Sequence, residues 1–193
     1  MLYPTELSYY KDSYETSLHT EIIRVDHQAN NKLDIYLDAT IFYPFGGGQP
    51  SDQGILITET GKAEIKNVQM QSGVVKHEAV LLDGEISDGQ EADLELNWER
   101  RHWNMRVHSA GHIIHDVLMG MVNGLTPARG DHGSKPYLEY IPELDSSIDC
   151  EKLKEQLREE VNKVIHEDRQ VETRETTLAE LQSIAKFIPP NLP

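Results

Sequence analysis

The hydrophobic pattern of the chain changes its period close to Trp98, and this change constrains the fold more than any other feature. Before it, short runs rich in Ile, Val, Leu and Tyr are separated by Asn, Asp and Gly, which is typical of strands and tight turns. After it, residues 99–122 form a long stretch at helical period with few breakers. We therefore expect a β-rich domain over residues 1–97 and a second, helix-containing domain over residues 98–193.

The first domain is expected to contain six strands that pack as a small barrel or sandwich. In residues 33–37 the apolar side chains occupy every second position, as in a half-buried strand, and Asn30-Asn31 before them signals a turn. Further turns are expected at Ser72-Gly73, Asp83-Gly84 and Asp88-Gly89. The expected strands cover residues 21–25, 33–42, 54–58, 63–71, 73–80 and 91–96.

The second domain is expected to combine helices with a short strand. Asn123-Gly124 is a stop signal for the first helix, and Asp149 is a suitable N-cap for the next long one, whose apolar residues recur at helical spacing. The expected elements are a helix over residues 99–122, a loop over 126–134, a strand over 137–141 and helices over 151–168 and 178–185. Together with the strands of the first half, this order predicts an α+β fold.

The composition excludes several classes of protein. The 18 Lys and Arg residues are outnumbered by 33 Asp and Glu, and the net charge of −15 argues against a basic chromatin-type protein or a polybasic membrane protein. Apolar runs stay well short of the roughly 20 residues that a membrane-spanning helix requires. The single cysteine, Cys150, cannot form an intramolecular disulfide, which agrees with a reducing compartment. We expect a soluble, cytoplasmic protein without a membrane partner.

His108 and His112 stand four residues apart in the expected long helix. They therefore project from one face, which His115 shares, and could bind one metal ion through neutral imidazoles. The residues Ser-Ala-Gly between them are small and would let another segment approach the pair closely. The alternative is that these histidines only pack or cap. Because no Glu follows His108, the HExxH arrangement of metallopeptidases is absent.

Three adjacent glycines, Gly46, Gly47 and Gly48, follow the expected strand over residues 33–42. They expose backbone N–H groups and allow a ligand to come close to the main chain, while Gln49 offers both a donor and an acceptor. The alternative interpretation is a flexible connection between strands.

A small basic cluster, Arg100, Arg101 and Arg106, is interleaved with Trp98 and Trp103. From residue 98 to residue 135 there are five Lys or Arg against three Asp or Glu, a positive balance within an acidic chain. Such a surface could bind phosphate and stack unpaired bases on its tryptophans. It could equally be a solvated helix face with two core tryptophans.

Two segments, taken together, carry a resemblance to a known family. Residues 40–54 (TIFYPFGGGQPSDQG) and residues 106–115 (RVHSAGHIIH) resemble the editing domain of alanyl-tRNA synthetase, and most of all its free-standing relatives, the AlaX proteins. The two motifs in this order and spacing are far more specific than either alone. The resemblance implies a small N-terminal β-barrel-like domain followed by a C-terminal α+β two-layer domain of the synthetase editing type.

The resemblance also implies one Zn²⁺ per chain, held between HxxxH and a later CxxxH. His108 and His112 match the first half of this site. The second half is missing, since Lys154 stands where Cys150 would need a histidine. We therefore expect that the second domain is truncated at its C-terminus, or that His115, water or a second chain completes the site.

The function implied by the resemblance is that of a trans-editing hydrolase, independent of ATP, which deacylates mischarged Ser-tRNA(Ala) and Gly-tRNA(Ala) as a monomer or homodimer. Thr40 and Gln49 would be the catalytic residues, with Thr40 contacting the serine hydroxyl. The substrate would be bound by Gly46, Gly47, Gly48 and Arg106. The alternative is a non-catalytic module that binds tRNA or protein and retains the fold with an incomplete metal site.

Overall fold

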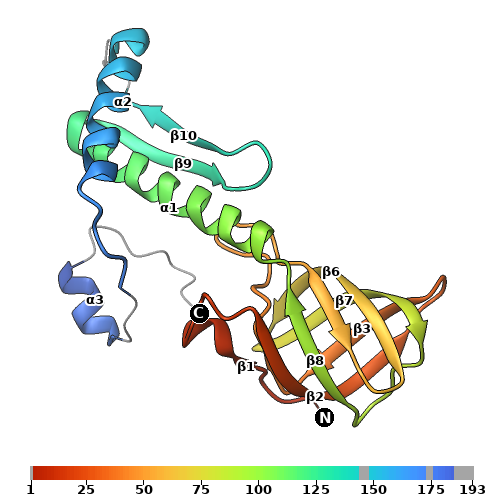
Figure 1. The fold of residues 1–193 in the computed structure, drawn as a ribbon. Coiled ribbons are helices and arrows are strands. Elements are labelled where there is room, and N and C mark those ends of the chain that lie inside the picture. The colour runs from red at the N-terminus through yellow and green to blue at the C-terminus, as the bar shows by residue number, and fades with distance from the viewer. Residues whose placement is uncertain (1, 144–147, 173–175, 185–193) are drawn as a thin grey trace.

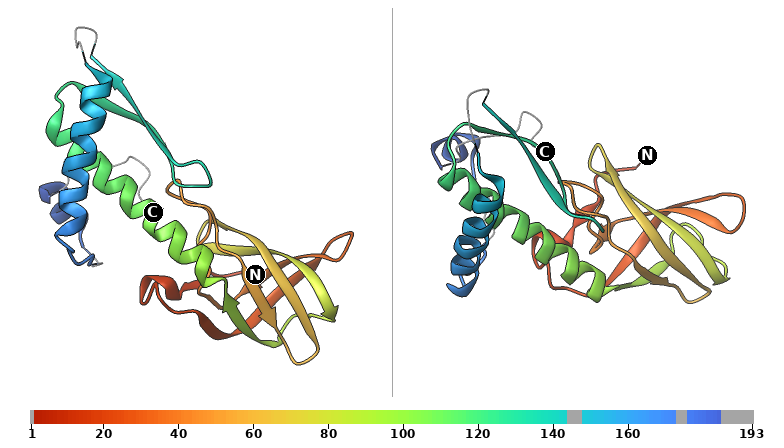
Figure 2. Two further views of the ribbon diagram at one scale, coloured as in Figure 1. Left: turned by 45° about the horizontal axis from the view of Figure 1, so that its top comes forward. Right: turned by 90° about the horizontal axis from the view of Figure 1, so that it is seen from above.

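The structure, a computed structural model, describes residues 2–143, 148–172 and 176–184. A β-barrel lies at one end, and a long helix, α1 (Trp98–Met121), projects from it (Figure 1). A hairpin of β9 (Leu125–Asp131) and β10 (Tyr137–Pro142) returns beside α1, so that its tip approaches the barrel (Figure 2). Helix α2 (Cys150–His166) packs against the part of α1 that is far from the barrel.

The barrel confirms the expected closed β-structure of the first half. Its strands follow the order β2-β3-β7-β6-β5-β8, and all neighbours in it are antiparallel. The bounds are Ser17–His27 for β2, Lys32–Leu37 for β3, Gly54–Ile57 for β5, Gly61–Gln71 for β6, Val74–Gly84 for β7 and Glu91–Leu96 for β8. A short parallel pair, β1 (Glu6–Leu7) with β4 (Ala39–Thr40), and the 3₁₀ turn η1 (Ser8–Tyr10) lie beside it.

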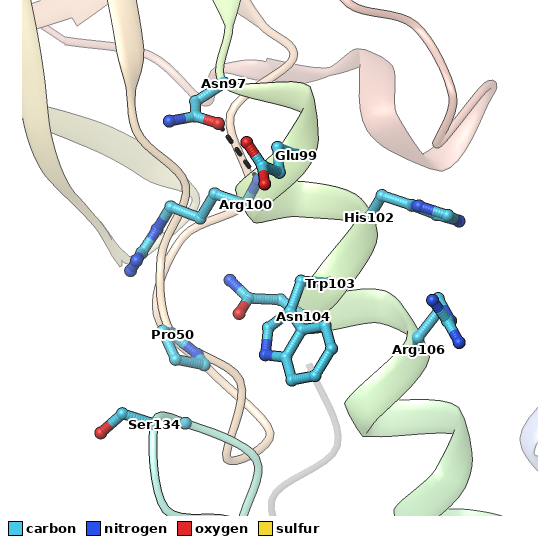
Figure 3. Close-up of a pocket in the computed structure, with 10 residues that line it drawn as sticks. Pro50, Asn97, Glu99, Arg100, His102, Trp103, Asn104, Arg106 and Ser134 are labelled. Atoms are coloured by element: carbon cyan, nitrogen blue, oxygen red, sulfur yellow. Dashed lines mark hydrogen bonds between the residues drawn. The ribbon is translucent and has the colours of Figure 1, made fainter.

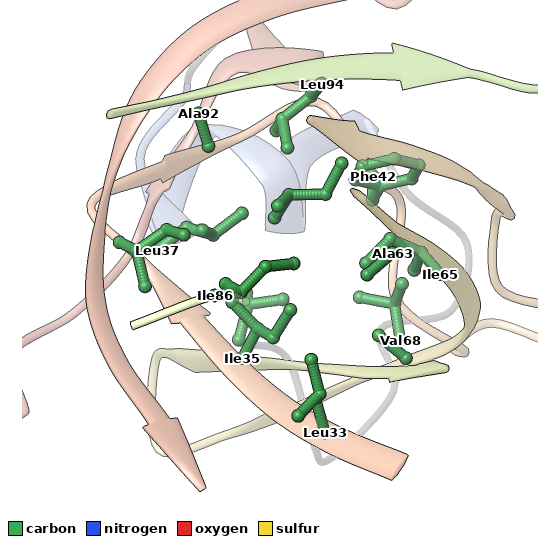
Figure 4. Close-up of a cluster of buried hydrophobic side chains, with 14 of the residues drawn as sticks. Leu33, Ile35, Leu37, Phe42, Ala63, Ile65, Val68, Ile86, Ala92 and Leu94 are labelled. Carbon is green, nitrogen blue, oxygen red and sulfur yellow. The ribbon is translucent and has the colours of Figure 1, made fainter. Parts of the chain in front are cut away.

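The barrel interior is filled by inward-facing residues that alternate with outward-facing ones along the strands (Figure 4). Leu33, Ile35 and Leu37 of β3 are buried, while the residues between them are not, and β8 shows the same strict alternation. Burial of such side chains supplies most of the stability of a small barrel. The barrel is therefore a rigid support for the loops at its rim.

The turns agree only in part with the sequence prediction. Ser72 and Gly73, with φ angles of 52° and 78°, form a two-residue hairpin turn between the paired residues Gln71 and Val74. Asn30 and Asn31, with φ angles of 61° and 57°, lie in a longer turn, in which Gln28 N donates to Lys32 O at 2.8 Å. The prediction of a turn at Asp83-Gly84 is wrong, because both residues continue β7. The expected strand 33–42 is also interrupted, since Asp38 separates β3 from β4.

The second half contains the expected helices and one unexpected strand. The side chain of Asn97 caps α1 by accepting from Arg100 N, and that of Asp149 caps α2 by accepting from Lys152 N. The prediction of a loop over residues 126–134 is wrong. Residues 125–131 form β9 despite Pro127. Because β9 pairs only with β10 within the described part of the chain, one of its edges is unpaired, and a proline, which lacks a backbone N–H, is tolerated on such an edge strand.

The remaining elements complete the described chain. Helix α3 (Leu178–Ile184) corresponds to the expected helix 178–185, whereas Ala185 and the segment in which we expected truncation lie outside the described residues. Within the described ranges, none of the helices has the length and apolar character needed to cross a bilayer. Strand β8 ends at Leu96 and α1 begins at Trp98, and the division into two domains stays a prediction.

Candidate active site between the glycine hairpin and the histidine helix

The three glycines form a tight hairpin at the rim of the barrel. Gly46 N donates to Gln49 O at 3.3 Å, and Gln49 N donates to Gly46 O at 2.9 Å. The two residues between them, Gly47 and Gly48, have φ angles of 57° and 77°, which glycine adopts without strain. The alternative of a flexible connection is therefore not needed: these glycines define one specific turn, which we call the glycine hairpin (residues 46–49).

The glycine hairpin contacts the histidine helix through a side-chain hydrogen bond. Gln49 is 4% exposed, and its Oε1 lies 2.9 Å from Nδ1 of His108 on α1. An amide oxygen can only accept, so Nδ1 carries the proton and donates. Nε2 of His108 therefore keeps its lone pair for another ligand. The structure thus brings together Gln49 and His108, which are 59 residues apart in the sequence.

A third imidazole, His132, joins this contact from the tip of the β9–β10 hairpin. Its backbone N–H donates to Gly48 O at 2.8 Å. Its ring stacks on that of His108 with centroids 4.6 Å apart, and it lies so close to Gly111 that an added Cβ there would be 2.4 Å from its Cε1. The expectation that small residues between the helix histidines admit another segment is confirmed at Gly111. Sequence reasoning missed His132 as a member of the site, although it belongs to the same histidine-rich stretch.

His108 and His132, two members of the histidine cluster (His108, His112 and His132), are held in their neutral form. The rings of His108 and His112 lie 4.9 Å apart and are nearly parallel. Burial, reinforced by the neighbouring His132 and His112, lowers the pKa of His108 to about 4. Burial and the nearby His112 also lower the pKa of His132. Neutral imidazoles are the form that can bind metal or accept a proton.

His115, the third histidine of this helix face, has a different partner. His115 Nδ1 lies 2.9 Å from the hydroxyl of Tyr140 on β10, and the two rings are stacked. Among the described residues, no group of three or more His, Cys, Asp or Glu has a geometry that could hold a metal ion. The donor chemistry of His108 and His112 nevertheless fits two of the four positions of a zinc site.

A cavity of about 460 Å³ opens beside the Gln49–His108 contact. It is bounded by Tyr9, Tyr10, Tyr43 and Met105 in addition to Gln49 and His108. Tyr9 stacks edge-on against Tyr43, and burial raises the pKa of both phenols, so they remain protonated donors. Lys11, Asp12, Ser13 and Arg101 also line it, so the cavity combines aromatic walls with polar and charged groups and suits a small polar organic group. The sequence did not single out its tyrosines, because they come from separate segments.

Thr40 is not brought to this cavity. It is fully buried, and its Oγ1 lies 2.8 Å from Nε2 of His77 and 3.1 Å from the N–H of Phe42. His77 Nδ1 lies 3.1 Å from Ile35 O and must donate to it, so Nε2 is an acceptor and the Thr40 hydroxyl is its donor. The hydroxyl is thus already engaged within the barrel, and its expected contact with a substrate serine stays a prediction.

We expect His77 to make the protein less stable in acid. Burial lowers the pKa of His77 from 6.5 to about 4, so the unfolded chain takes up a proton at a pH where the folded chain does not. The contribution of neutral His77 to the free energy of unfolding is therefore complete above pH 6.5 and is lost as the pH falls from 6.5 to about 4. Between pH 7 and pH 5 the free energy of unfolding should drop by about 2 kcal/mol more in the wild type than in His77→Gln. Urea unfolding at both pH values measures this difference, and an equal drop in the two proteins would contradict it.

The basic cluster is divided by the structure. Arg101 is only 2% exposed and forms a buried ion pair with Asp52, so it does not belong to the phosphate-binding surface that was one of the two interpretations of this cluster. Trp98 is half-buried and packs against the barrel core, whereas Trp103 is 60% exposed. Arg106 is exposed on α1, one turn from Trp103. Arg100, Trp103 and Arg106 all border a second cleft, which lies along α1.

Comparison with known proteins agrees with this arrangement. Residues 4–100, half of the chain, match the family model described as tRNA synthetases class II (A). The chain is 32% identical over 165 residues to the alanyl-tRNA editing protein AlaX-L of Pyrococcus horikoshii, which covers 84% of this chain and 39% of that protein.

Two alanine–tRNA ligases match a similar part of the chain. The ligase of Neorickettsia sennetsu is 34% identical over 160 residues (82% of this chain, 19% of the ligase), and that of Methanopyrus kandleri is 32% identical over 171 residues (88% and 18%). The chain therefore spans less than two fifths of the length of each of these relatives. It belongs to the class II (A) tRNA synthetase family, within the group formed by the editing regions of alanyl-tRNA synthetases and free-standing editing proteins.

Proposed function

We propose that this protein hydrolyses the ester bond of mischarged Ser-tRNA(Ala), and also that of Gly-tRNA(Ala), as a trans-editing deacylase. The similarity to AlaX-L and to alanine–tRNA ligases supports an editing-related role. The observation that carries the proposal is the 2.9 Å contact between Gln49 Oε1 and His108 Nδ1 beside the tyrosine-lined cavity. It joins the two motifs of the family at one point, where an aminoacyl ester could be held.

Each residue of the site has a task in this reaction. Gln49 holds the proton of His108 on Nδ1 and so directs the free Nε2 lone pair to a ligand or a proton. The backbone N–H groups of Gly47 and Gly48 donate to no other described residue and are suited to the ester oxygen or the terminal ribose. The aromatic walls, Tyr9 and Tyr43, exclude bulk water from the reacting bond.

We further propose that His108 and His112 contribute two ligands to one Zn²⁺, with the other positions filled by groups that are not among the described residues. The neutral state of His108 and the orientation of its ring by Gln49 support this assignment, because ligating imidazoles need both. When bound, zinc would supply a Lewis acid that orients the ester and makes a nearby water more acidic.

The chemistry of serine and alanine explains why such an activity is needed. A pocket built for alanine cannot strongly reject serine, which adds one hydroxyl, so binding alone discriminates by about two orders of magnitude. A second site that hydrogen-bonds the serine hydroxyl can reject alanine much more strongly, by roughly 10⁴-fold, because alanine leaves a buried polar group unpaired. A separate hydrolytic site therefore removes serine more selectively than the first site can exclude it.

A second candidate function is a non-catalytic module that binds tRNA. The observation that favours it is the metal site: the described residues supply the pair His108 and His112, but no group of three ligands.

A direct assay distinguishes the two functions. In it, purified protein with added Zn²⁺ is mixed with Ser-tRNA(Ala), Gly-tRNA(Ala) and Ala-tRNA(Ala). Faster loss of the seryl and glycyl esters than of the alanyl ester supports the deacylase. Retained tRNA binding with no ester loss supports the module.

A further inference from the structure

A second cleft, of about 900 Å³, runs between the first turns of α1 and the loop that follows the glycine hairpin. Figure 3 shows Pro50 on the loop side and Trp103 on the helix side. Pro50 directly follows Gln49, and Asn104 lies one turn before His108 on α1. Both walls of the cleft are therefore formed by segments that also supply residues to the proposed active site, although the two cavities share no described lining residue.

Trp103 gives this cleft an exposed aromatic wall. Its indole is 60% exposed, and no aromatic ring among the described residues stacks on it, whereas Trp98 is half-buried and stacks on His102. An exposed tryptophan at the edge of a polar cleft costs hydrophobic free energy unless a partner covers it. Planar aromatic groups are the partners that an indole face binds best.

The same cleft carries positive charge. Arg106 has no ion pair or hydrogen bond with any other described residue, and Arg100 uses its Nε to bond Ser51 O at 3.1 Å. Glu99 is the acidic residue of the lining. In a chain of net charge −15, two arginines against one acid mark a local surface that favours an anion.

A buried polar group in the cleft wall points to a hydrogen-bonding ligand. Asn104 is only 5% exposed, and its Nδ2 has no hydrogen-bond partner among the described residues. The side chain lies behind the indole of Trp103 in Figure 3, between helix and loop. A buried amide donor without a partner is costly, and an acceptor supplied by a ligand would remove that cost.

We propose that this cleft binds unpaired nucleotides of RNA, namely those that precede the esterified nucleotide of the substrate tRNA. The proposal rests on the deacylase function proposed above. A base stacks on Trp103, its edge presents an acceptor to Asn104 Nδ2, and the flanking phosphates lie near Arg100 and Arg106. A nucleotide combines a flat aromatic ring, an acceptor on its edge and a negative charge.

Tryptophan fluorescence and affinity test the stacking step. Trp98→Phe leaves Trp103 as the sole tryptophan of the chain, and a single-stranded RNA of about six nucleotides ending in CCA should quench its emission. Trp103→Ala should bind this RNA about tenfold more weakly than the wild type by fluorescence anisotropy. Tyr3→Ala, which removes an aromatic residue that is 51% exposed outside the cleft, is the matched control and should bind as the wild type does.

Salt dependence tests the phosphate contact. Arg106→Gln should weaken RNA binding and lower the slope of log affinity against log salt by about 0.7, the value for one phosphate of a single strand. Arg158→Gln, which removes an exposed arginine from α2, should leave both the affinity and the slope unchanged.

The possible outcomes separate this inference from the proposed function. Equal RNA affinity of Trp103→Ala and the wild type would overturn the cleft assignment, even if Ser-tRNA(Ala) is hydrolysed. Binding of a free mononucleotide or of duplex RNA as tightly as the single strand would also overturn it. Conversely, RNA binding that depends on Trp103 in a protein without deacylase activity would support the cleft while the hydrolytic function fails. If Trp98→Phe does not fold, the difference in quenching between the wild type and Trp103→Phe reports the same contact.

Discussion

His108→Ala is expected to reduce hydrolysis of Ser-tRNA(Ala) about a hundredfold or more, since ligand and ligand-orienting groups typically carry effects of that order. The substitution removes the imidazole that Gln49 orients and that stacks on both His112 and His132. The rate is measured under single-turnover conditions with Zn²⁺ added. Zinc content, determined by metal analysis of the purified protein, should fall in parallel, which gives a second reading that does not depend on activity.

Two further variants sharpen this test. Gln49→Leu should lose activity by about tenfold to a hundredfold because the ring of His108 is no longer held, whereas Gln49→Glu, which keeps an acceptor for Nδ1–H, should retain most of it. His166→Ala removes an exposed histidine at the end of α2 and should behave as the wild type. Wild-type activity and zinc content in His108→Ala would remove both the metal role and the catalytic role of this residue.

The elements that the sequence predicts well are those whose side chains alternate or repeat over many residues. Strand β3 shows its alternation in Leu33, Ile35 and Leu37, and α1 is long enough for its helical period to be unmistakable. Strand β9 was missed because it carries Pro127 and Gly130 and owes its pairing to β10 rather than to its own residues.

In the site, the motif residues were easier to predict than the groups around them. Gln49 and His108 belong to recognisable motifs, and the structure brings them together. His132 could not be assigned, because it reaches the site only through the docking of the β9–β10 tip on Gly48. The burial of Arg101 could not be predicted for a similar reason: neither charge nor spacing distinguishes it from Arg100, and only the fold turns one of them inward to Asp52.

Loss of the buried Arg101–Asp52 pair should have the largest effect on stability. Asp52 Oδ2 accepts from Arg101 Nε at 2.8 Å and from Tyr43 N at 2.6 Å, and Arg101 also donates to the backbone oxygens of Ser13 and Ile41. Arg101→Met would leave the carboxylate of Asp52 buried without its cation. We expect the free energy of unfolding to fall by about 3–5 kcal/mol, as measured by urea denaturation.

The pair also fixes the active site, because it ties α1 to the segment that follows the glycine hairpin. The double variant Arg101→Met/Asp52→Leu, which removes both charges, should recover part of the stability lost in Arg101→Met, since the cost lies in the unpaired charge. Lys163→Ala, which breaks an exposed pair with Glu160, should unfold like the wild type. If Arg101→Met were as stable as Lys163→Ala, the buried pair would not hold α1 on the barrel. The contact of His108 with Gln49 would then have to be maintained by the β9–β10 tip alone.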